Sequence, residues 1–301
     1  MTSEAKAIQQ IEALQLAPKT RFWIIDFLVR LRRDPLGMFG LIGVLLFLVL
    51  AIVAPWISPY SPTEMSFPLR QPPTLAHPFG TDTLGRDMFS RVLRATPNEV
   101  KIGLGSVFIG TGLATLVGLV SGYMGGIVDS IIQRIVDTLL AFPSLILLMV
   151  LASVLTPSTR SLMIALIIGS LPGGSRIIRG AVLAVRNNTY IEAARVLGAS
   201  GTRIMFRHIL PQIVPFLIVI VSIMIPAIAL LAAALSFLGL GLPPPNPSWG
   251  GEISRARGTF PHYMWLAICP GAVLSLYVLS FNLLGDSMRD ILDPRLRGSR
   301  R

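Results

Sequence analysis

The segment TYIEAARVLGASGTRIMFRHILP, residues 189–211, is a polar and basic stretch between two long apolar stretches of the chain. Thr189 and Glu192 have the spacing of a capping box, in which two side chains cap the first turn of a helix. The alanines that follow favour a helix, and a Ser-Gly pair interrupts it. The helical pattern then resumes until Pro211, which precedes the next apolar run. We therefore expect two short helices joined by a turn.

Small residues give the first of these helices a flat face. Ala194 and Gly198 lie four residues apart, which places them on one side of a helix. Such a face lets another protein approach the backbone closely, and basic side chains surround it at Arg195, Arg203 and Arg207. We predict a docking surface for a partner protein. The alternative is that the small residues only suit a short helix and the glutamate only caps it.

The composition excludes a soluble globular domain. Of 301 residues, 52% are hydrophobic and 14% are charged, whereas soluble domains carry about 25% charged residues. Charge-free runs occupy residues 36–63, 102–128, 138–159, 161–175, 208–251 and 258–285. A helix needs roughly 20 apolar residues to cross a bilayer core. Each run is therefore predicted to hold one span, which gives an all-α membrane protein with six transmembrane helices.

The run at 208–251 allows two readings. A single helix of this length would extend roughly 66 Å, which is too long for one straight span. Prolines between residues 243 and 247 break a helix there, so we expect one span at about 212–235 and an uncharged external loop after it. Two spans would instead place the C-terminus on the other side of the membrane.

The distribution of basic residues decides between these topologies. With six spans, 18 of the 26 lysines and arginines lie on the face that holds both termini and the 176–207 loop. Cytoplasmic segments carry such an excess of Lys and Arg. We therefore expect a multi-pass protein of the bacterial inner membrane with both termini cytoplasmic. The net charge of +11 then reflects topology, and no nucleic-acid partner is predicted.

These patterns divide the chain into five segments. We expect a cytoplasmic N-terminal segment at 1–35, a first transmembrane helix at 36–57, an external loop at 58–101, a five-helix core at 102–285 with a cytoplasmic loop at 176–211, and a cytoplasmic tail at 286–301. Trp23, Phe27 and Leu31 recur every four residues among arginines, which predicts an N-terminal interfacial helix lying on the membrane. A cytosolic helix packed on the protein is the alternative.

Several chemical functions have no residues to carry them. Cys269 is the only cysteine and the three histidines are scattered, so no metal site is predicted. None of the three lysines follows a glycine, as the phosphate-binding Walker A loop requires. The charge-free runs offer no side chain to carry a coupling ion, which disfavours a secondary carrier, although backbone carbonyls of broken helices remain possible ligands. We expect no catalysis and no cofactor in this chain.

The order of residues in the 189–211 segment resembles the EAA signature of permease subunits of bacterial ABC importers, E-A-A-x-x-x-G-x(9)-I-x-L-P. Glu192, Ala193, Ala194, Gly198, Leu210 and Pro211 match at the required spacing. His208 occupies the usual Ile position, and this variant is similar to the peptide/nickel branch. The resemblance implies that the segment is a coupling helix that docks into a cleft of an ATPase subunit. The residues it implicates are Glu192, Ala193, Ala194, Arg195, Gly198, Ala199, Arg203, Leu210 and Pro211.

A second resemblance, to the C-type permease of dipeptide/oligopeptide importers, runs from about residue 30 to 297. It rests on the segments RDPL at 33–36, APWISPY at 54–60, HPFGTD at 77–82, LGRD at 84–87, LSFLGLG at 235–241, PSWG at 247–250, FNLLGD at 281–286 and DPRL at 293–296. The RATPNE segment at 94–99 departs from the family pattern. Its Pro97 predicts a local kink.

The two resemblances together imply a type I ABC importer permease fold. The implied partners are a second, homologous permease subunit, two ATP-binding subunits that hold ATP and Mg, and a periplasmic or lipid-anchored substrate-binding protein. The implied substrate is a di- or oligopeptide. Nickel chelates, glutathione and oligosaccharides are alternatives within the family, and an ion-coupled carrier is the alternative outside it.

Other residues are weaker candidates for a functional role. Contact with the binding protein is one reading of Asp82, Arg86, Asp87 and Trp249. The alternative for the three charged residues is an ion-pair network within the loop, and for the tryptophan an interfacial anchor. Pro215 and Pro226 are predicted to bend the fifth span. The bend either helps this span to line the transport pathway or serves packing alone. Gly118, Gly122 and Gly126 form a small-residue ladder, predicted to pack within the chain, with a dimer seam as the alternative.

Overall fold

The structure is a computed structural model that describes residues 29–292, and within this range the chain forms helices and no β-strand. The helices are α3 (Pro35–Ile57), α4 (Met88–Met124), α5 (Gly126–Leu140), α6 (Ser144–Val154), α7 (Thr159–Val185), α8 (Thr189–Val196), α9 (Gly201–Arg203), η1 (Ile204–Ile209), α10 (Leu210–Phe237), α11 (Trp249–Ala256) and α12 (Trp265–Leu292). The predicted all-α fold is confirmed.

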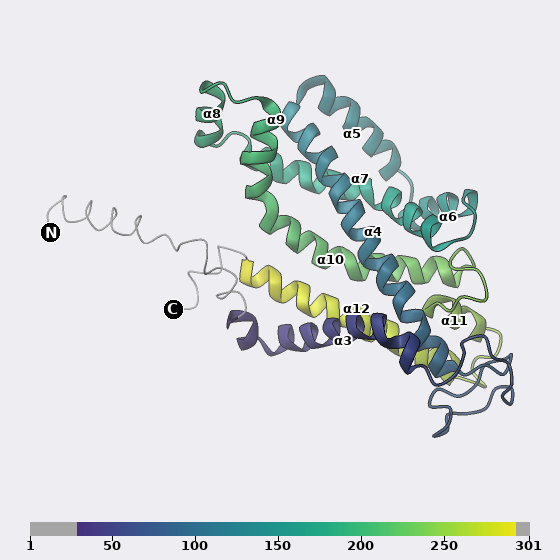
Figure 1. The fold of residues 1–301 in the computed structure, drawn as a ribbon. Helices are drawn as coiled ribbons and strands as arrows, with labels where there is room; N and C mark the ends of the chain where they lie inside the picture. The colour runs from purple at the N-terminus through teal and green to yellow at the C-terminus, as the bar shows by residue number, and fades with distance from the viewer. Residues whose placement is uncertain (1–28, 293–301) are drawn as a thin grey trace.

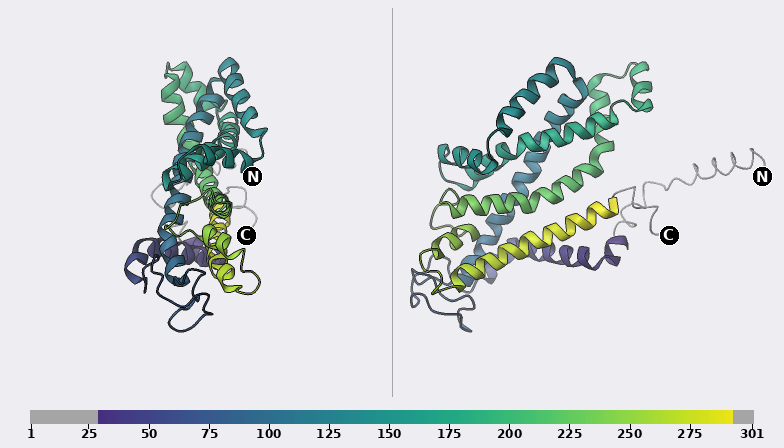
Figure 2. Two further views of the ribbon diagram at one scale, coloured as in Figure 1. Left: turned by 90° about the vertical axis from the view of Figure 1, so that its right-hand side faces the viewer. Right: turned by 180° about the vertical axis from the view of Figure 1, so that it is seen from behind.

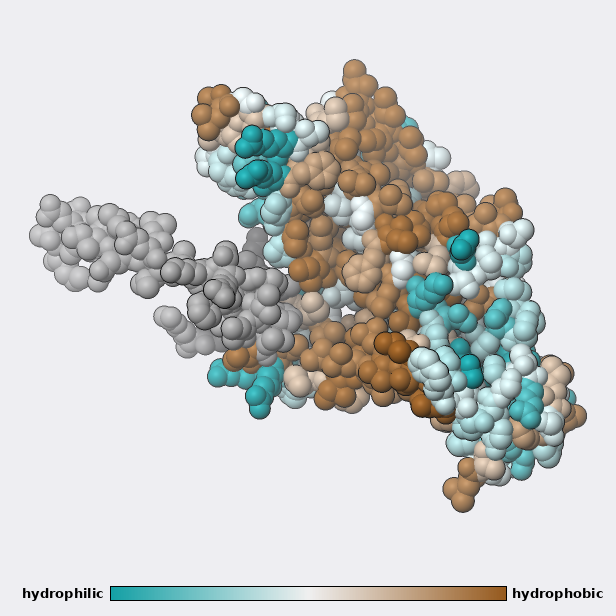
Figure 3. All heavy atoms as spheres, in the orientation of Figure 1, coloured by the Kyte–Doolittle hydropathy of each residue, from teal (hydrophilic) through white to brown (hydrophobic). Residues whose placement is uncertain are grey.

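The long helices run side by side, and α8 and α11 lie at opposite ends of the bundle (Figure 1). Helix α12 packs between α3 and α10, while α4 crosses the bundle and contacts α3, α7 and α10 (Figure 2). The start of α3 and the end of α12 point toward the end that carries α8. Hydrophobic atoms cover the middle of the molecule, and hydrophilic atoms gather at the two ends (Figure 3). This distribution is that of a membrane protein.

Five helical stretches within the described range are long and apolar enough to cross a membrane. A sixth span requires that α5 and α6, which meet at 90°, be counted together. The predicted six spans agree with the structure on that count. The third span was expected at 138–159, but the pair covers 126–154 and is broken at Pro143, which has no N–H to continue α5 and precedes the first residue of α6.

The external loop is shorter than the expected range of 58–101, because α4 begins at Met88. Asp87 caps this helix, since its carboxylate accepts a hydrogen bond from the backbone N–H of Ser90 at 2.7 Å. The helix continues through Pro97 without interruption. Its 37 residues extend about 55 Å, well beyond a hydrocarbon core of about 30 Å. A search for charge-free runs misses the first turns of α4 because they carry charged side chains.

Near the two ends of the described range, the helix boundaries differ less from the predicted segments. Helix α12 continues to Leu292, so it takes in the first part of the predicted tail at 286–301. Asp34 caps α3 by accepting a hydrogen bond from the N–H of Leu36 at 3.2 Å, and Pro35 follows in the first turn. Most of the predicted interfacial helix, including Trp23 and Phe27, lies outside the described residues. Residues 29–33, with which the described range begins, are helical.

Glycines allow the closest helix contacts. A Cβ atom on Gly118 would lie 2.9 Å from the carbonyl oxygen of Ser175, and one on Gly122 would lie 2.8 Å from Val182. These two glycines of the predicted ladder therefore pack α4 against α7 within the chain, while Gly126 has no atom within 4 Å of its Cβ position. Ion pairs between α5 and α7, Asp129–Arg179 and Asp137–Arg176, hold the other side of α7.

Close packing at glycines also joins α3 to α12. Gly37, Gly40 and Gly43 form a stripe on α3 that faces α12. A Cβ atom on Gly40 would lie only 2.5 Å from the backbone nitrogen of Leu284. Small residues let membrane helices approach closely enough for extensive van der Waals contact, which is a main source of helix association in lipid.

We expect Gly40→Ala to lower the thermal stability of the detergent-solubilised protein, because the added methyl group would force α3 away from α12. Overpacking of this kind costs about 1–3 kcal/mol. Gly112→Ala is the matched control, since no atom lies within 4 Å of its Cβ position. Thermal unfolding followed by circular dichroism measures both, and equal melting temperatures for the two variants would contradict the close contact.

Candidate functional site: the 189–211 loop and the external cap

Helix α8 begins one residue earlier than the predicted capping box requires. Asn188 is the N-cap and makes no side-chain capping hydrogen bond, and Thr189 is already the first helical residue. The N–H of Glu192 donates to the backbone carbonyl of Asn188 at 3.2 Å, and its side chain is exposed. The predicted capping box is therefore wrong. The carboxylate of Glu192 is left free to meet another molecule.

Gly198 ends α8 and is not part of its face. It has φ +79°, in the left-handed region that glycine adopts without a steric penalty. The N–H of Gly198 donates to the carbonyl of Arg195 at 3.0 Å, and that of Ala199 to the carbonyl of Ala194 at 3.0 Å. This is the Schellman pattern of helix termination. The expected flat face of Ala194 and Gly198 does not form, because the glycine lies beyond the end of the helix.

Three buried isoleucines anchor the loop to the bundle. Ile191 of α8 and Ile204 and Ile209 of η1 are each 0% exposed. They pack in one hydrophobic cluster with Leu119, Ile178, Val182 and Ile213, which belong to α4, α7 and α10. The loop is therefore packed into a hydrophobic core that it shares with three long helices.

The outer end of the loop is apolar and open. Val196 is 87% exposed and Leu197 is 85% exposed, and this adjacent pair forms the apolar tip of the loop. Isolated exposed apolar residues are common, but a pair this exposed on a short polar loop suits a protein interface. The sequence analysis did not identify this pair, because two adjacent apolar residues are common and do not indicate whether their side chains are buried or exposed.

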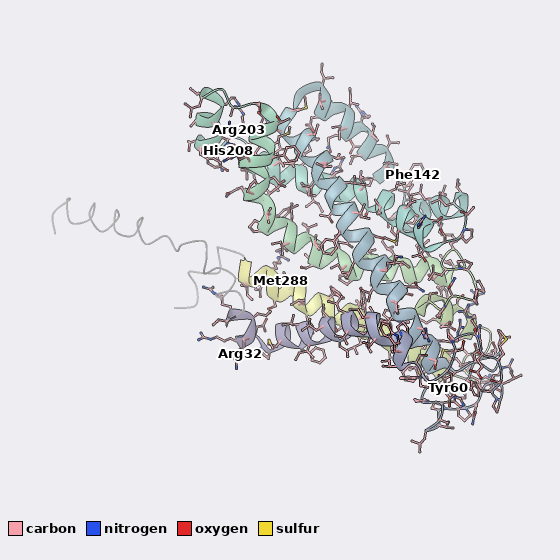
Figure 4. The ribbon with its side chains drawn as sticks, viewed as in Figure 1. Arg32, Tyr60, Phe142, Arg203, His208 and Met288 are labelled. Carbon is pink, nitrogen blue, oxygen red and sulfur yellow. The ribbon has the colours of Figure 1, made fainter. Side chains whose placement is uncertain are left out.

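The other predicted loop residues surround this tip at different depths. Exposed side chains are those of Glu192, Ala193, Arg195, Arg203 and Pro211, and half-buried ones are those of Ala194, Ala199 and Leu210. Arg203 and His208 both lie on the helical segment beside α8 (Figure 4). The structure thus brings the residues of the EAA-like segment together at one end of the molecule.

The second arm of the loop continues into the fifth span without a break. Residues 201–237 form one helical stretch of 37 residues that includes α9, η1 and α10. The turns of η1 are wider than in an α-helix, and the N–H of Leu210 donates to the carbonyl of Met205, five residues earlier. The second arm of the loop and α10 are therefore parts of one continuous helical stretch.

Three charged residues of the 58–87 segment have their partners within the segment itself. Asp82 and Arg86 are each 4% exposed and form an ion pair at 2.6 Å. Asp87 is 1% exposed, and its carboxylate lies 2.9 Å from Nδ1 of His77 while it caps α4. Direct contact of these three side chains with a binding protein is therefore wrong, because they are buried. Of the alternative, an ion-pair network of all three residues, the structure has the Asp82–Arg86 pair, whereas Asp87 contacts His77.

Trp249 is neither a binding-protein contact nor an interfacial anchor. It is fully buried, and its ring packs edge to face against Phe47 and Tyr277 with centroids 5.9 and 5.4 Å apart. Its indole N–H donates to the carbonyl of Val92 at 3.0 Å. Both expectations for Trp249 are wrong because the proline-rich segment before it folds back onto the bundle. The residues exposed instead at this end belong to the 58–87 segment and include Glu64, Arg70 and Leu75.

The predicted pathway residues, Pro215 and Pro226, differ in how deeply they are buried. Helix α10 passes through both prolines as one helix. Pro215 is exposed, whereas Pro226 is buried and does not line an open path in this conformation.

A cavity of about 20 Å³ lies between α4, α7 and α10, with Thr111 and Ser170 among its lining residues. It holds little more than a water molecule. Within residues 29–292, no group of three His, Cys, Asp or Glu side chains is placed to hold a metal ion.

A bundle of membrane-length helices with one anchored, outward-facing polar loop is typical of a multi-pass integral membrane protein. The family model described as binding-protein-dependent transport system inner membrane component matches residues 114–298. A model of the N-terminal TM domain of oligopeptide transport permease C matches residues 22–74. The chain belongs to the binding-protein-dependent transport permease family.

Individual relatives agree with this assignment. The chain is 42% identical over 276 residues to the glutathione transport system permease protein GsiD of Escherichia coli O6:K15:H31, covering 91% of each chain. It is 38% identical over 291 residues to a probable D,D-dipeptide transport system permease protein of Escherichia coli K12, covering 96% of this chain and 98% of that one. The MetNI methionine ABC transporter, at 20% identity, has a TM-score of 0.57 over 68% of this chain and 97% of its own, which shows a shared fold.

Gly198→Ala is expected to loosen the 189–203 region, because a left-handed conformation costs an L-residue about 1–2 kcal/mol. We expect amide hydrogen exchange in peptides from this region to accelerate by roughly tenfold, the factor that about 1.4 kcal/mol represents. Gly198→Asn is the matched control, since Asn tolerates this conformation better than Ala. Equal exchange in the alanine variant and the unmodified protein would contradict the conformational role of Gly198.

Proposed function

We propose that this chain is a permease subunit of an ATP-driven importer for di- or oligopeptides. It forms half of a translocation pathway and receives force through the 189–211 loop. The observation that carries the proposal is the loop itself, which is anchored by buried isoleucines and offers an open apolar tip to a partner. Membership of the permease family and the dipeptide relative support this reading.

Glutathione, a tripeptide, is the second candidate substrate. A glutathione permease shares 42% of its residues with this chain over 276 aligned positions. Neither candidate requires a charged wall in this subunit, and the cavity between α4, α7 and α10 is lined only by apolar and small polar residues within the described range. Substrate choice then depends on the binding protein that delivers the peptide.

The assembly follows from the same assignment. The chain pairs with a second, homologous permease subunit and two ATP-binding subunits, and a periplasmic or lipid-anchored protein delivers the substrate. ATP and Mg are bound and ATP is hydrolysed by the partner subunits. Both chain termini lie in the cytoplasm of a bacterium, which is consistent with the position of the described ends on the side of α8 (Figure 1).

Uptake by the purified complex tests this function. The chain, its permease partner, the ATPases and the binding protein are reconstituted in liposomes and supplied with a radiolabelled dipeptide or with labelled glutathione. We expect uptake only when ATP and the ATPases are present. Uptake that persists without the ATPases would instead favour an ion-coupled carrier, and absence of a stable complex with the ATPases would contradict the proposal.

The apolar tip of the loop gives a direct test of docking. The double variant Val196→Asp and Leu197→Asp places two charges where an apolar contact is expected, so the ATPases should no longer co-purify with the permease. Leu75→Asp is the matched control, since it adds a charge at a fully exposed leucine of the external loop. We expect the control to retain the ATPases. Retention by the double variant would place the docking surface elsewhere.

A further inference from the structure

Helix α11 lies between the external ends of α10 and α4 and contacts each with a different side. On one side, the hydroxyl of Ser254 donates to the carbonyl of Phe237, at the last residue of α10, at 2.6 Å. Gly250 packs so closely on α10 that a Cβ atom there would lie 2.2 Å from the carbonyl oxygen of Ala233. These two residues, four apart, share one face of α11.

The other side of α11 is bound to α4 by polar contacts in an apolar environment. Glu99 is 4% exposed, and its carboxylate accepts a hydrogen bond from the backbone N–H of Trp249 at 2.9 Å. This N–H belongs to the first turn of α11, where backbone donors have no partner within the helix and the helix dipole favours a negative charge. The indole N–H of Trp249 adds its bond to Val92 of α4.

A buried ion pair reinforces this attachment. Arg91 of α4 donates from Nε and Nη2 to one carboxylate oxygen of Glu252, at 2.9 and 2.7 Å, and both residues are 1% exposed or less. Arg255 contacts the same carboxylate at 2.6 Å. Burial alone would raise the pKa of Glu252, but the guanidinium groups of Arg255 and Arg91 hold that pKa below its ordinary value. Removing one partner of such a pair leaves an uncompensated buried charge.

The position of α11 is important because α10 connects it to the 189–211 loop. The helical stretch 201–237 begins in the 189–211 loop and ends at the α11 contact, and its 37 residues measure about 55 Å along the helix. The stretch bends between the loop and the rest of α10 but has no break in its helical backbone (Figure 1). Movement of the loop therefore arrives at the external end of α10, where α11 contacts α10, α12 and α4 and adds polar contacts to the direct packing of α10 on α4.

We propose that α11 is a clamp that transmits the movement of α10 to the external half of α4, and that Glu99 and Arg91 are positioning residues of the transport cycle. The proposal rests on the function proposed above, since it assumes that the 189–211 loop is driven by ATPases. With the clamp attached, ATP-driven movement at the cytoplasmic end changes the external end. With the clamp detached, ATP is hydrolysed but the external end no longer follows.

The decisive comparison is between Glu99→Met and Glu99→Gln. Methionine has a similar volume but its thioether is only a weak acceptor for the Trp249 N–H, whereas the glutamine side-chain oxygen is a good one. In the reconstituted importer we expect Glu99→Met to assemble and hydrolyse ATP while the labelled peptide transported per ATP falls roughly tenfold, which corresponds to about 1.4 kcal/mol. Glu99→Gln should restore most of the transport, and Glu64→Met, at an exposed glutamate of the external loop, should leave it unchanged.

Hydrogen exchange gives a second readout that is independent of transport. Amides at the start of α11 should exchange faster in Glu99→Met than in Glu99→Gln or the unmodified complex. If Glu99→Met does not assemble, Trp249→Phe takes its place, because it keeps an aromatic ring but removes the indole N–H bonded to Val92. A several-fold fall in transport per ATP is then expected.

The outcomes separate the clamp from the function it serves. Unchanged transport per ATP in the Met or Phe variant, in a complex whose unmodified form takes up the peptide, overturns the clamp and leaves the importer intact. Absence of ATP-dependent uptake by the unmodified complex contradicts the proposed function itself. An equal loss in Glu99→Met and Glu99→Gln also overturns the clamp, since it would assign the effect to the charge and not to the hydrogen bond.

Discussion

The hydrocarbon core of a bilayer offers no hydrogen-bond partner to a peptide group, so each backbone N–H and C=O there must be satisfied by the chain itself. This constraint explains why the described chain crosses its apolar middle only as helices. It also explains where irregular backbone occurs: the 58–87 segment, the break at Pro143 and the turn at Gly198 all separate helices or lie at their ends. Pro172 of α7 and Pro226 of α10 lie inside helices and are buried against neighbouring elements.

Polar chemistry is consequently concentrated at the two ends of the bundle, and the two ends are built differently. At the end that carries the 58–87 segment and α11, charged groups are buried and paired in the Arg91–Glu252 and Asp82–Arg86 contacts. At the opposite end, the charged groups of the 189–211 loop stay exposed while isoleucines anchor it. A paired, buried network suits a rigid body, and an exposed loop suits a docking surface. The long helix 201–237 connects the two.

The sequence analysis predicted the transmembrane helices well in charge-free runs and less well where a helix carries charged residues. The start of α4 escaped prediction because Arg91, Glu99 and their neighbours resemble a soluble loop until their partners in α11 are known, and those partners lie about 150 residues later in the chain. The 189–211 loop was identified by residue order alone. The orientation of its residues was not, because a shift of one residue at Asn188 moves Thr189 out of the cap.

The contact between α3 and α12 joins the first and last long helices of the described chain, with about 200 residues between them. Translation at about 5–20 residues per second takes roughly 10–40 seconds to cover that distance. During this time the glycine stripe of α3 enters the membrane with no helix of its own chain to receive it. Biosynthesis therefore has to keep α3 from pairing with other nascent helices until α12 emerges from the ribosome.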